Sequence, residues 1–214
     1  MSGEAPCVLG IDTAAPVVGA ALVGAGAPRA WSERVVRGAD AALLPAIDDL
    51  LRGARLDAVA VSCGPGAFTS LRVGVAAALG VALARGVPVV SVSSLEARAR
   101  AVGAGRVLAL LDARKGRAYA ALFEGGHRVG DERDVPPESA IGLAAGAPFL
   151  ATGEGAVVWR SAVEAAGGEV VSAPAASPAA TVALLGAARL AEAVAPAAVR
   201  LNYIRPSDAV PPRR

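Results

Sequence analysis

Residues 59–85 read VAVSCGPGAFTSLRVGVAAALGVALAR and predict a strand, a tight turn and a long helix in immediate succession. An apolar run with β-branched residues opens the stretch, and Gly64 and Gly66 mark the turn around Pro65. No charged residue lies between Arg72 and Arg85, where small and aliphatic side chains follow one another. A strand that passes through a glycine-rich turn into a helix is typical of α/β proteins.

The helix predicted over residues 69–85 is apolar on opposite sides, so we expect it to be covered on more than one side. One side suits a sheet of the same chain, and the other predicts a partner. Ser70, Gly74 and Ala78 recur every four residues, and this row of small side chains would let another helix approach closely. Arg72 is either an ion-pair partner across that interface or a surface charge with its stem along apolar surface.

A second helix is predicted over residues 40–52, where leucine and isoleucine recur at helical spacing. Asp40 is its candidate N-cap and Gly53 its candidate end, whereas Pro45 predicts a kink or a later start. The alternative to a partner-facing role is that both helices place these apolar rows in the core, which must hold for at least half of them. The residues expected at the partner interface are Leu43, Leu44, Ile47, Leu51, Thr69, Ser70, Arg72, Val73, Gly74, Ala77, Ala78 and Val81.

The remaining pattern suggests that one structural unit occurs twice. Two apolar strands end on carboxylates, Asp12 and Asp112, and each begins an expected order of three strands, a helix, a strand and a helix. We therefore expect an α/β fold with a mixed sheet in each half, residues 1–103 and residues 104–206. The pattern leaves open whether the helix expected at 181–194 packs back onto the first half. Residues 207–214 are expected to be a disordered tail.

Composition excludes several classes of protein. The net charge is only +2, which is too small for a strongly basic nucleic-acid binder. Apolar residues make up 54% of the chain, but no uninterrupted apolar run reaches the roughly 18 residues of a membrane span, so we expect no membrane contact. Cys7 and Cys63 are interpreted as reduced core thiols, and the N-terminus shows no export signal, which favours a cytoplasmic protein.

A kinase needs carboxylates for Mg²⁺, and Asp12 and Asp112, each at the end of an apolar strand, are the candidates. The turn after Asp12 has no glycine, and the turn after Asp112 carries Lys115, so neither resembles a phosphate cradle. The alternatives left open are strand-end carboxylates that orient turns, weak nucleotide binding and a working ATPase. Gly64 and Gly66 either hold an anion at the helix start or merely allow a turn, with Thr69 as helix cap. No metal-ligand cluster is visible in the sequence, and no cofactor is expected.

Three stretches together resemble the TsaB (YeaZ) family: LGIDTA at 9–14, GPGAFTSLRVGVAAALGVA at 64–82 and LLDARKGRAYAALF at 110–123. Three shorter stretches fall in the same order and spacing, namely LLPAIDDLL at 43–51, SVSSLEA at 91–97 and YIRP at 203–206. Where many relatives carry a His-Ser-Glu-like triplet, this chain has Ala39, Asp40 and Ala41, which removes a candidate metal ligand.

The resemblance implies the actin-like fold of sugar kinases and Hsp70, built of two ribonuclease-H-like lobes. It also implies a non-catalytic subunit that pairs with TsaD through first-lobe helices to make threonylcarbamoyladenosine at position 37 of tRNAs reading codons that begin with adenine. The ATPase TsaE would join that assembly, tRNA would be met only within it, and the chain alone would form homodimers. The alternative is a nucleotide-binding or peptidase-like enzyme of the same fold, against which the missing phosphate turns argue.

Overall fold

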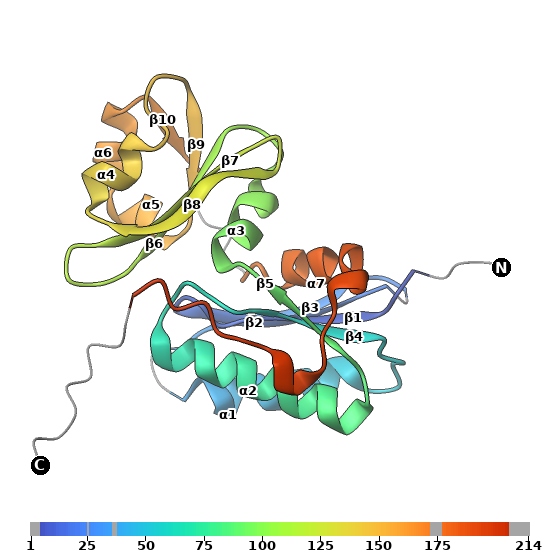
Figure 1. The fold of residues 1–214 in the computed structure, drawn as a ribbon. Helices are drawn as coiled ribbons and strands as arrows, with labels where there is room; N and C mark the ends of the chain where they lie inside the picture. The colour runs from blue at the N-terminus through green and yellow to red at the C-terminus, as the bar shows by residue number, and fades with distance from the viewer. Residues whose placement is uncertain (1–4, 25, 36–37, 172–176, 206–214) are drawn as a thin grey trace, which may run out of the picture.

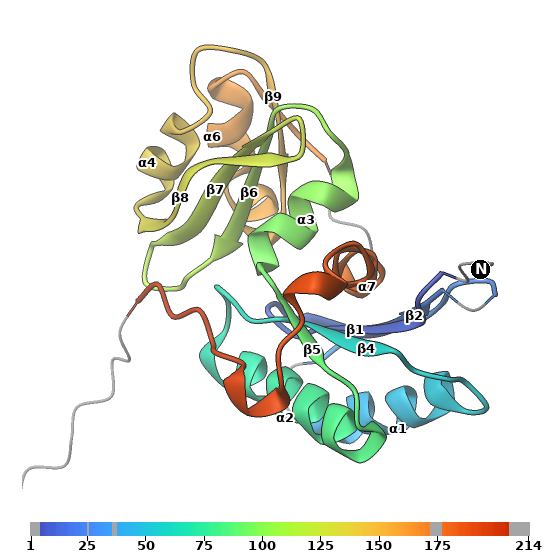
Figure 2. The ribbon, with the colours of Figure 1, turned by 45° about the vertical axis from the view of Figure 1, so that its right-hand side comes forward.

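The computed structural model describes residues 5–24, 26–35, 38–171 and 177–205, and it contains two five-stranded mixed sheets, one from each half of the chain (Figure 1). The tail expected at residues 207–214 lies outside the described residues. The two halves lie next to each other, with the helix of residues 94–102 between them (Figure 2).

The first sheet has the strand order β3-β2-β1-β4-β5, in which β1 pairs antiparallel with β2 and parallel with β4. Both faces of β1 and β4 are buried, which explains why their sequences are apolar without alternation. Its elements are β1 (Val8–Asp12), β2 (Val17–Val23), β3 (Arg29–Arg34), α1 (Ala39–Leu51), β4 (Ala58–Ser62), α2 (Phe68–Arg85), β5 (Val89–Val92) and α3 (Ser94–Val102).

The second sheet repeats this arrangement with the order β8-β7-β6-β9-β10. Here β6 pairs antiparallel with β7 and parallel with β9, as β1 does with β2 and β4, so the duplication expected from the sequence is confirmed. The second half of the chain contains, in order, β6 (Val107–Asp112), β7 (Ala118–Glu124), β8 (His127–Val135), α4 (Pro137–Gly142), β9 (Phe149–Thr152), α5 (Glu154–Val158), α6 (Arg160–Ala165), β10 (Gly168–Val170) and α7 (Ala179–Ala188).

Helices cover both faces of the first sheet. α1 and α2 lie side by side on one face, and α7 lies on the other, although α7 comes almost at the end of the chain (Figures 1 and 2). Gly10 of β1 makes this possible, because a Cβ there would collide with the backbone of Ala179 and Ala183. The helix expected at 181–194 thus belongs spatially to the first sheet. It spans Ala179–Ala188, so it is shorter than predicted.

The second sheet is covered by α4, α5 and α6 on one face and by α3 on the other. Leu95 and Ala99 of α3 pack against the strands of this sheet, while the same helix also contacts α7. We call the first sheet with α1, α2 and α7 the first lobe, and the second sheet with α4, α5 and α6 the second lobe. α3 is then the connection that lies between the two lobes (Figure 2).

Local signals located the helices well but misplaced two caps. Ser93 caps α3, with its Oγ accepting a hydrogen bond from the Glu96 amide. Asp40 is not the cap of α1, because that helix starts at Ala39 after Gly38 and runs through Pro45. Thr69 is not the cap of α2 either, since the N-cap position is Ala67 and Thr69 lies within the first turn. Gly53, with a positive φ of 70°, follows α1 as expected.

After α7 the chain crosses back over both lobes. A 3₁₀ turn at Pro196–Ala198 packs against α2, and the Asn202 amide donates a hydrogen bond of 2.7 Å to the carbonyl of Cys63. The segment then reaches the second lobe, where the Arg205 guanidinium contacts Asp134 at 2.7 and 3.0 Å. Burial by itself would raise the pKa of Asp134, but Arg205 and Arg117 outweigh it and hold that pKa below its usual value.

We predict that Asp134→Asn lowers the free energy of unfolding by about 1–3 kcal/mol at pH 7. The Asp134 carboxylate has a lowered folded pKa, so its contribution is present above the unfolded pKa of about 3.9 and is lost as the pH falls below that value. Urea unfolding at pH 7, 5 and 3.5 should show the gap between the variant and the unchanged protein closing at the lowest pH. Asp48→Asn is the matched control, because its contact with Arg52 is exposed. A gap that stays constant with pH would contradict the ion pair.

Candidate functional site

Half of the residues predicted at a partner interface are buried inside this chain. Leu43, Ile47 and Leu51 of α1 pack in the core against the first sheet, as does Ala77 of α2. Their assignment to a partner is therefore corrected, for the physical reason that a helix on a sheet must use its own most apolar stripe for the core. The remaining predicted positions, Leu44, Thr69, Ser70, Arg72, Val73 and Val81, are exposed or half-buried.

The small-residue row of α2 also faces inward. Gly74 and Ala78 are buried, and a Cβ on Gly74 would collide with the side chain of Thr13 at the end of β1. The Thr13 hydroxyl donates a hydrogen bond of 2.7 Å to the Ser70 carbonyl, which fixes α2 against that turn. The close approach that Gly74 permits is thus an approach to a side chain of the first lobe itself. Spacing alone could not distinguish this from the approach of a foreign helix.

One stripe of the outward surface of α2, together with Leu44 of α1, is nevertheless free of charge, and we call it the outer face; the exposed charges Asp48 and Asp49 lie elsewhere on α1. Leu83 is 70% exposed and Leu44 is 51% exposed, which is unusual for leucine. Next to Leu83 on the exposed surface of α2, Ala76 has a small side chain and Gly80 has none, so little protrudes from the helix there. The exposed residues of the outer face are Leu44, Thr69, Ala76, Gly80 and Leu83.

At the N-terminal end of the outer face, Arg72 has partners that the sequence did not indicate. Its guanidinium lies 3.8 Å from the centre of the Phe68 ring, and its Nε donates a hydrogen bond of 3.1 Å to the Tyr203 hydroxyl. The Phe68 and Tyr203 rings are 4.8 Å apart. Within this chain the cation therefore stacks on an aromatic pair, a contact that the sequence prediction did not include.

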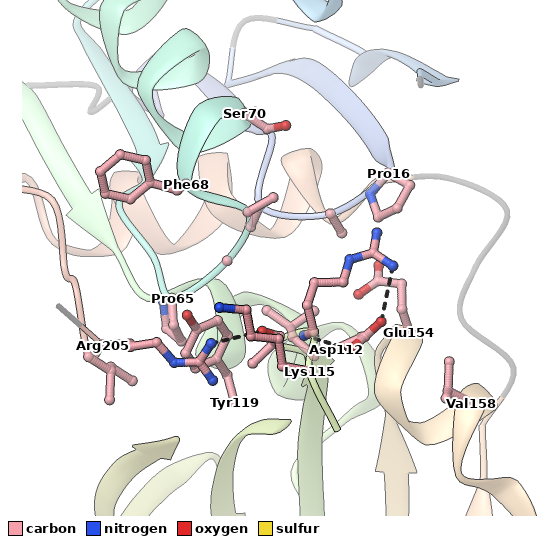
Figure 3. A pocket seen from close by; sticks show the side chains of 18 of the residues that line it. Pro16, Pro65, Phe68, Ser70, Asp112, Lys115, Tyr119, Glu154, Val158 and Arg205 are labelled. Atoms are coloured by element: carbon pink, nitrogen blue, oxygen red, sulfur yellow. Dashed lines mark hydrogen bonds and ion pairs between the residues drawn. The ribbon is translucent and has the colours of Figure 1, made fainter. Parts of the chain in front are cut away.

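A cavity of about 930 Å³ opens between the lobes (Figure 3). The first lobe contributes Pro16 and Phe68, and the second contributes Lys115, Tyr119 and Val158, as the close-up shows. Several of the lining side chains carry charge, namely Arg34, Asp112, Arg114, Lys115, Glu154 and Arg205. The volume is in the range of ligand pockets.

Asp12 does not line this cavity as a free carboxylate. It is fully buried, and the guanidinium of Arg98 donates to both of its oxygens, at 3.4 and 3.2 Å. Burial would lower the pKa of Arg98, but the carboxylates of Asp12 and Glu154 hold it above its usual value, so the arginine stays charged. An arginine thus occupies the coordination space that a metal would need at Asp12.

Asp112 orients the turn that follows it. Its Oδ1 accepts a hydrogen bond of 2.8 Å from the Arg114 amide, and Arg114 and Lys115 both adopt positive φ angles, 62° and 53°. The Gly64 turn is likewise filled by the chain itself, since a Cβ on Gly64 would lie 2.6 Å from the Asn202 carbonyl oxygen. A Cβ on Gly66 would lie equally close to the Ala14 carbonyl oxygen, at 2.6 Å. These contacts favour the interpretation of Asp112, Gly64 and Gly66 as turn-forming residues.

Three further features concern metal binding, the reactivity of Cys63 and the apolar character of α2. Among the described residues, no group of three His, Cys, Asp or Glu is placed to hold a metal ion. Cys63 is buried, and burial raises the pKa of its thiol, which keeps it protonated and unreactive. α2 is long and apolar enough, at a mean hydropathy of 1.4, to cross a membrane. A core helix passes the same test, so this single helix is weak support for a membrane span.

The architecture defines the class of protein. Two lobes with equivalent sheets and a cleft between them are the actin-like fold of sugar kinases, and the chain is similar to a ROK hexokinase from Thermus thermophilus (TM-score 0.52, 13% identity, 87% of this chain and 99% of that one). A likeness at this identity concerns the fold alone. The chain is far more similar to YeaZ from Pseudomonas aeruginosa, with a TM-score of 0.78 and 28% identity over 92% of this chain and 99% of that one.

Sequence comparison agrees with the structural likeness. A family model described as TsaD, tRNA N6-adenosine threonylcarbamoyltransferase, matches residues 27–194. An uncharacterized protein of Mycobacterium tuberculosis is 40% identical over 157 residues, 66% of this chain and 72% of that protein. The tRNA threonylcarbamoyladenosine biosynthesis protein TsaB of Escherichia coli K12 is 36% identical over 126 residues, 55% of this chain and 54% of TsaB. The chain belongs to the TsaD family, on its TsaB (YeaZ) branch.

Two glycines lie on different sides of α2: Gly74 faces Thr13 of the same lobe, and Gly80 lies on the outer face. We predict that Gly74→Ala destabilises the chain by about 1–3 kcal/mol, because the added methyl group collides with Thr13. Gly80→Ala should instead stabilise it by about 0.5–1 kcal/mol, since no atom lies within 4 Å of the new Cβ and alanine favours a helix. Urea unfolding of both variants checks this. Equal stabilities would show that Gly74 does not contact β1 as described.

Proposed function

We propose that this chain is the non-catalytic subunit that binds and activates TsaD in making threonylcarbamoyladenosine. The reaction is the threonylcarbamoylation of adenosine 37 in tRNAs that read codons beginning with adenine. Membership of the TsaB branch supports the pathway, because TsaB of Escherichia coli is named as a protein of threonylcarbamoyladenosine biosynthesis.

The outer face is the observation that carries the proposed partnership. A leucine that is 70% exposed on a helix of small residues leaves apolar surface in water, and such surface marks sites of protein association. Small side chains at Ala76 and Gly80 would let a helix of TsaD lie close to α2. The interface now proposed therefore lies on a different side of α2 from the row of Ser70, Gly74 and Ala78.

The arrangement of charge supports a non-catalytic role. Asp12 is neutralised by Arg98, and Asp112 is engaged by the turn that follows it. In a kinase-like site these carboxylates would be needed for the metal that bridges the phosphates. We infer that threonylcarbamoyl transfer takes place on TsaD, and that this chain acts in the cytoplasm as its partner.

The same outer face would serve a homodimer when TsaD is absent, because a second copy offers an equally apolar surface. The ATPase TsaE would join the pair, and tRNA would be bound only by the assembled complex. The small net charge of +2 is consistent with a chain that contributes little to phosphate binding by itself.

We predict that Leu83→Glu weakens binding to the cognate TsaD at least about 100-fold, since a buried unpaired carboxylate would replace an apolar contact at the interface. Leu184→Glu is the matched control, because Leu184 is 59% exposed on α7, on the opposite face of the first sheet. Biolayer interferometry gives the two dissociation constants, and thermal unfolding should show similar midpoints for both variants. Normal binding by Leu83→Glu would contradict the proposed interface.

The reconstituted reaction tests activation separately. Formation of threonylcarbamoyladenosine on tRNA by TsaD and the other pathway proteins should need this chain, and it should fail with Leu83→Glu but not with Leu184→Glu. Full activity of TsaD without the chain would overturn the activating role, whatever the binding result.

A further inference from the structure

Arg98 is a buried cation shared between the two lobes. It comes from α3, the connecting helix, and its side chain is only 5% exposed. Its Nη2 lies 3.2 Å from Oδ2 of Asp12 and 3.7 Å from Oε1 of Glu154. Its Nη1 donates a hydrogen bond of 2.9 Å to the Ser94 carbonyl, which holds the guanidinium in one orientation.

The two carboxylates belong to different lobes. Asp12 ends β1 of the first lobe, and Glu154 begins α5 of the second, so Arg98 joins both through α3. The loop before α5 is packed on the stem of the same side chain, because a Cβ on Gly153 would lie 3.5 Å from Cδ of Arg98. The guanidinium is thus enclosed where the lobes and the connecting helix meet.

At this junction two carboxylates surround one cation, as carboxylates do in many metal sites, and here the cation is a guanidinium. Two carboxylates converge on a single point from two lobes, and the positive charge between them is the protein's own. Oε2 of Glu154 is buried and has no hydrogen-bond partner among the described residues. Since removal of one member of a buried ion pair leaves an uncompensated charge, the carboxylates depend on Arg98.

We propose that Arg98 is an internal cation that locks the lobes at one fixed angle and closes Asp12 to divalent metal ions. Proteins of two lobes around a cleft commonly open and close by a hinge motion. Here the hinge would have to separate Arg98 from Asp12 or from Glu154. Asp12 is fully buried, so water could not replace its lost contact, whereas the Glu154 side chain is 26% exposed and lines the cavity.

Contacts further from the hinge act in the same direction. Glu132 of β8 accepts hydrogen bonds from Ser93, next to α3, and from the Asn202 side chain amide at 2.7 Å. Arg205 ties the segment after α7 to Asp134 on the same strand. Rotation of the second lobe about Arg98 would strain all of these contacts at the same time, so they also oppose the motion. None of this depends on the proposed partner.

Distance measurement by pulsed electron spin resonance tests the lock in the isolated chain. Nitroxide labels at Arg85→Cys on α2 and Ala162→Cys on α6 report the separation of the lobes, and both positions are exposed whereas Cys7 and Cys63 are buried. We expect one narrow distance distribution that Mg²⁺ and ATP leave unchanged. Arg98→Met should at least double its width. Arg189→Met is the matched control, because it breaks the pair between Arg189, which follows α7, and Glu96 of α3 without touching Asp12.

Metal affinity provides a second readout. Arg98→Met leaves Asp12 and Glu154 without a cation, so it should bind Mn²⁺ at least tenfold more tightly than the unchanged chain in a titration followed by spin resonance. Glu154→Ala keeps the buried pair of Arg98 and Asp12, and it should broaden the distances without a gain in Mn²⁺ affinity. If Arg98→Met does not fold, Glu154→Ala decides both points: unchanged narrow distances would overturn the lock, and a gain in Mn²⁺ affinity with Arg98 still paired to Asp12 would overturn the exclusion of metal. Folded variants with unchanged narrow distances would overturn the lock, and unchanged Mn²⁺ affinity of folded Arg98→Met would overturn the exclusion of metal.

Discussion

A carboxylate without any exposed surface has to be neutralised, and this constraint on Asp12 shapes the centre of the molecule. The strand that carries Asp12 is the middle of the first sheet, so its end cannot move into solvent. The neutralising guanidinium comes from α3, and this requires α3 to lie between the lobes rather than beside one of them. The position of the second lobe follows, because α3 packs on its sheet and Glu154 reaches the same guanidinium.

The fold was predictable because its signals are local. Apolar strands without alternation, glycine at turns and serine before a helix each specify structure within a few residues, and the order of elements then repeats. The place of α7 was not predictable by such means, since it depends on the room that Gly10 leaves over β1, more than 160 residues earlier in the chain. Contacts of that separation leave no periodic trace in a single sequence.

The candidate site was predicted only in part, and α2 shows why. Periodicity revealed that the helix is apolar on opposite sides, but the small-residue row at Gly74 was assigned to the outside when it meets Thr13. A glycine that admits a foreign helix and a glycine that admits a side chain of the same protein are identical in sequence. Arg98 was missed for a related reason. It lies in a helix rich in arginine and alanine, where a surface role is the ordinary expectation, and only the position of α3 shows its burial.

A subunit that works by presenting a surface needs that surface to be held still, and the structure connects its rigid centre to the outer face by a continuous set of contacts. Thr13 follows Asp12 directly and donates its hydroxyl to the first turn of α2. Arg72, on the same turn, is held by Tyr203, and two residues later Arg205 is held by Asp134 of the second lobe. A shift between the lobes would therefore reach the beginning of α2 by two routes. The contacts proposed to hold the two lobes at one angle would thus also steady the helix on which the proposed association depends.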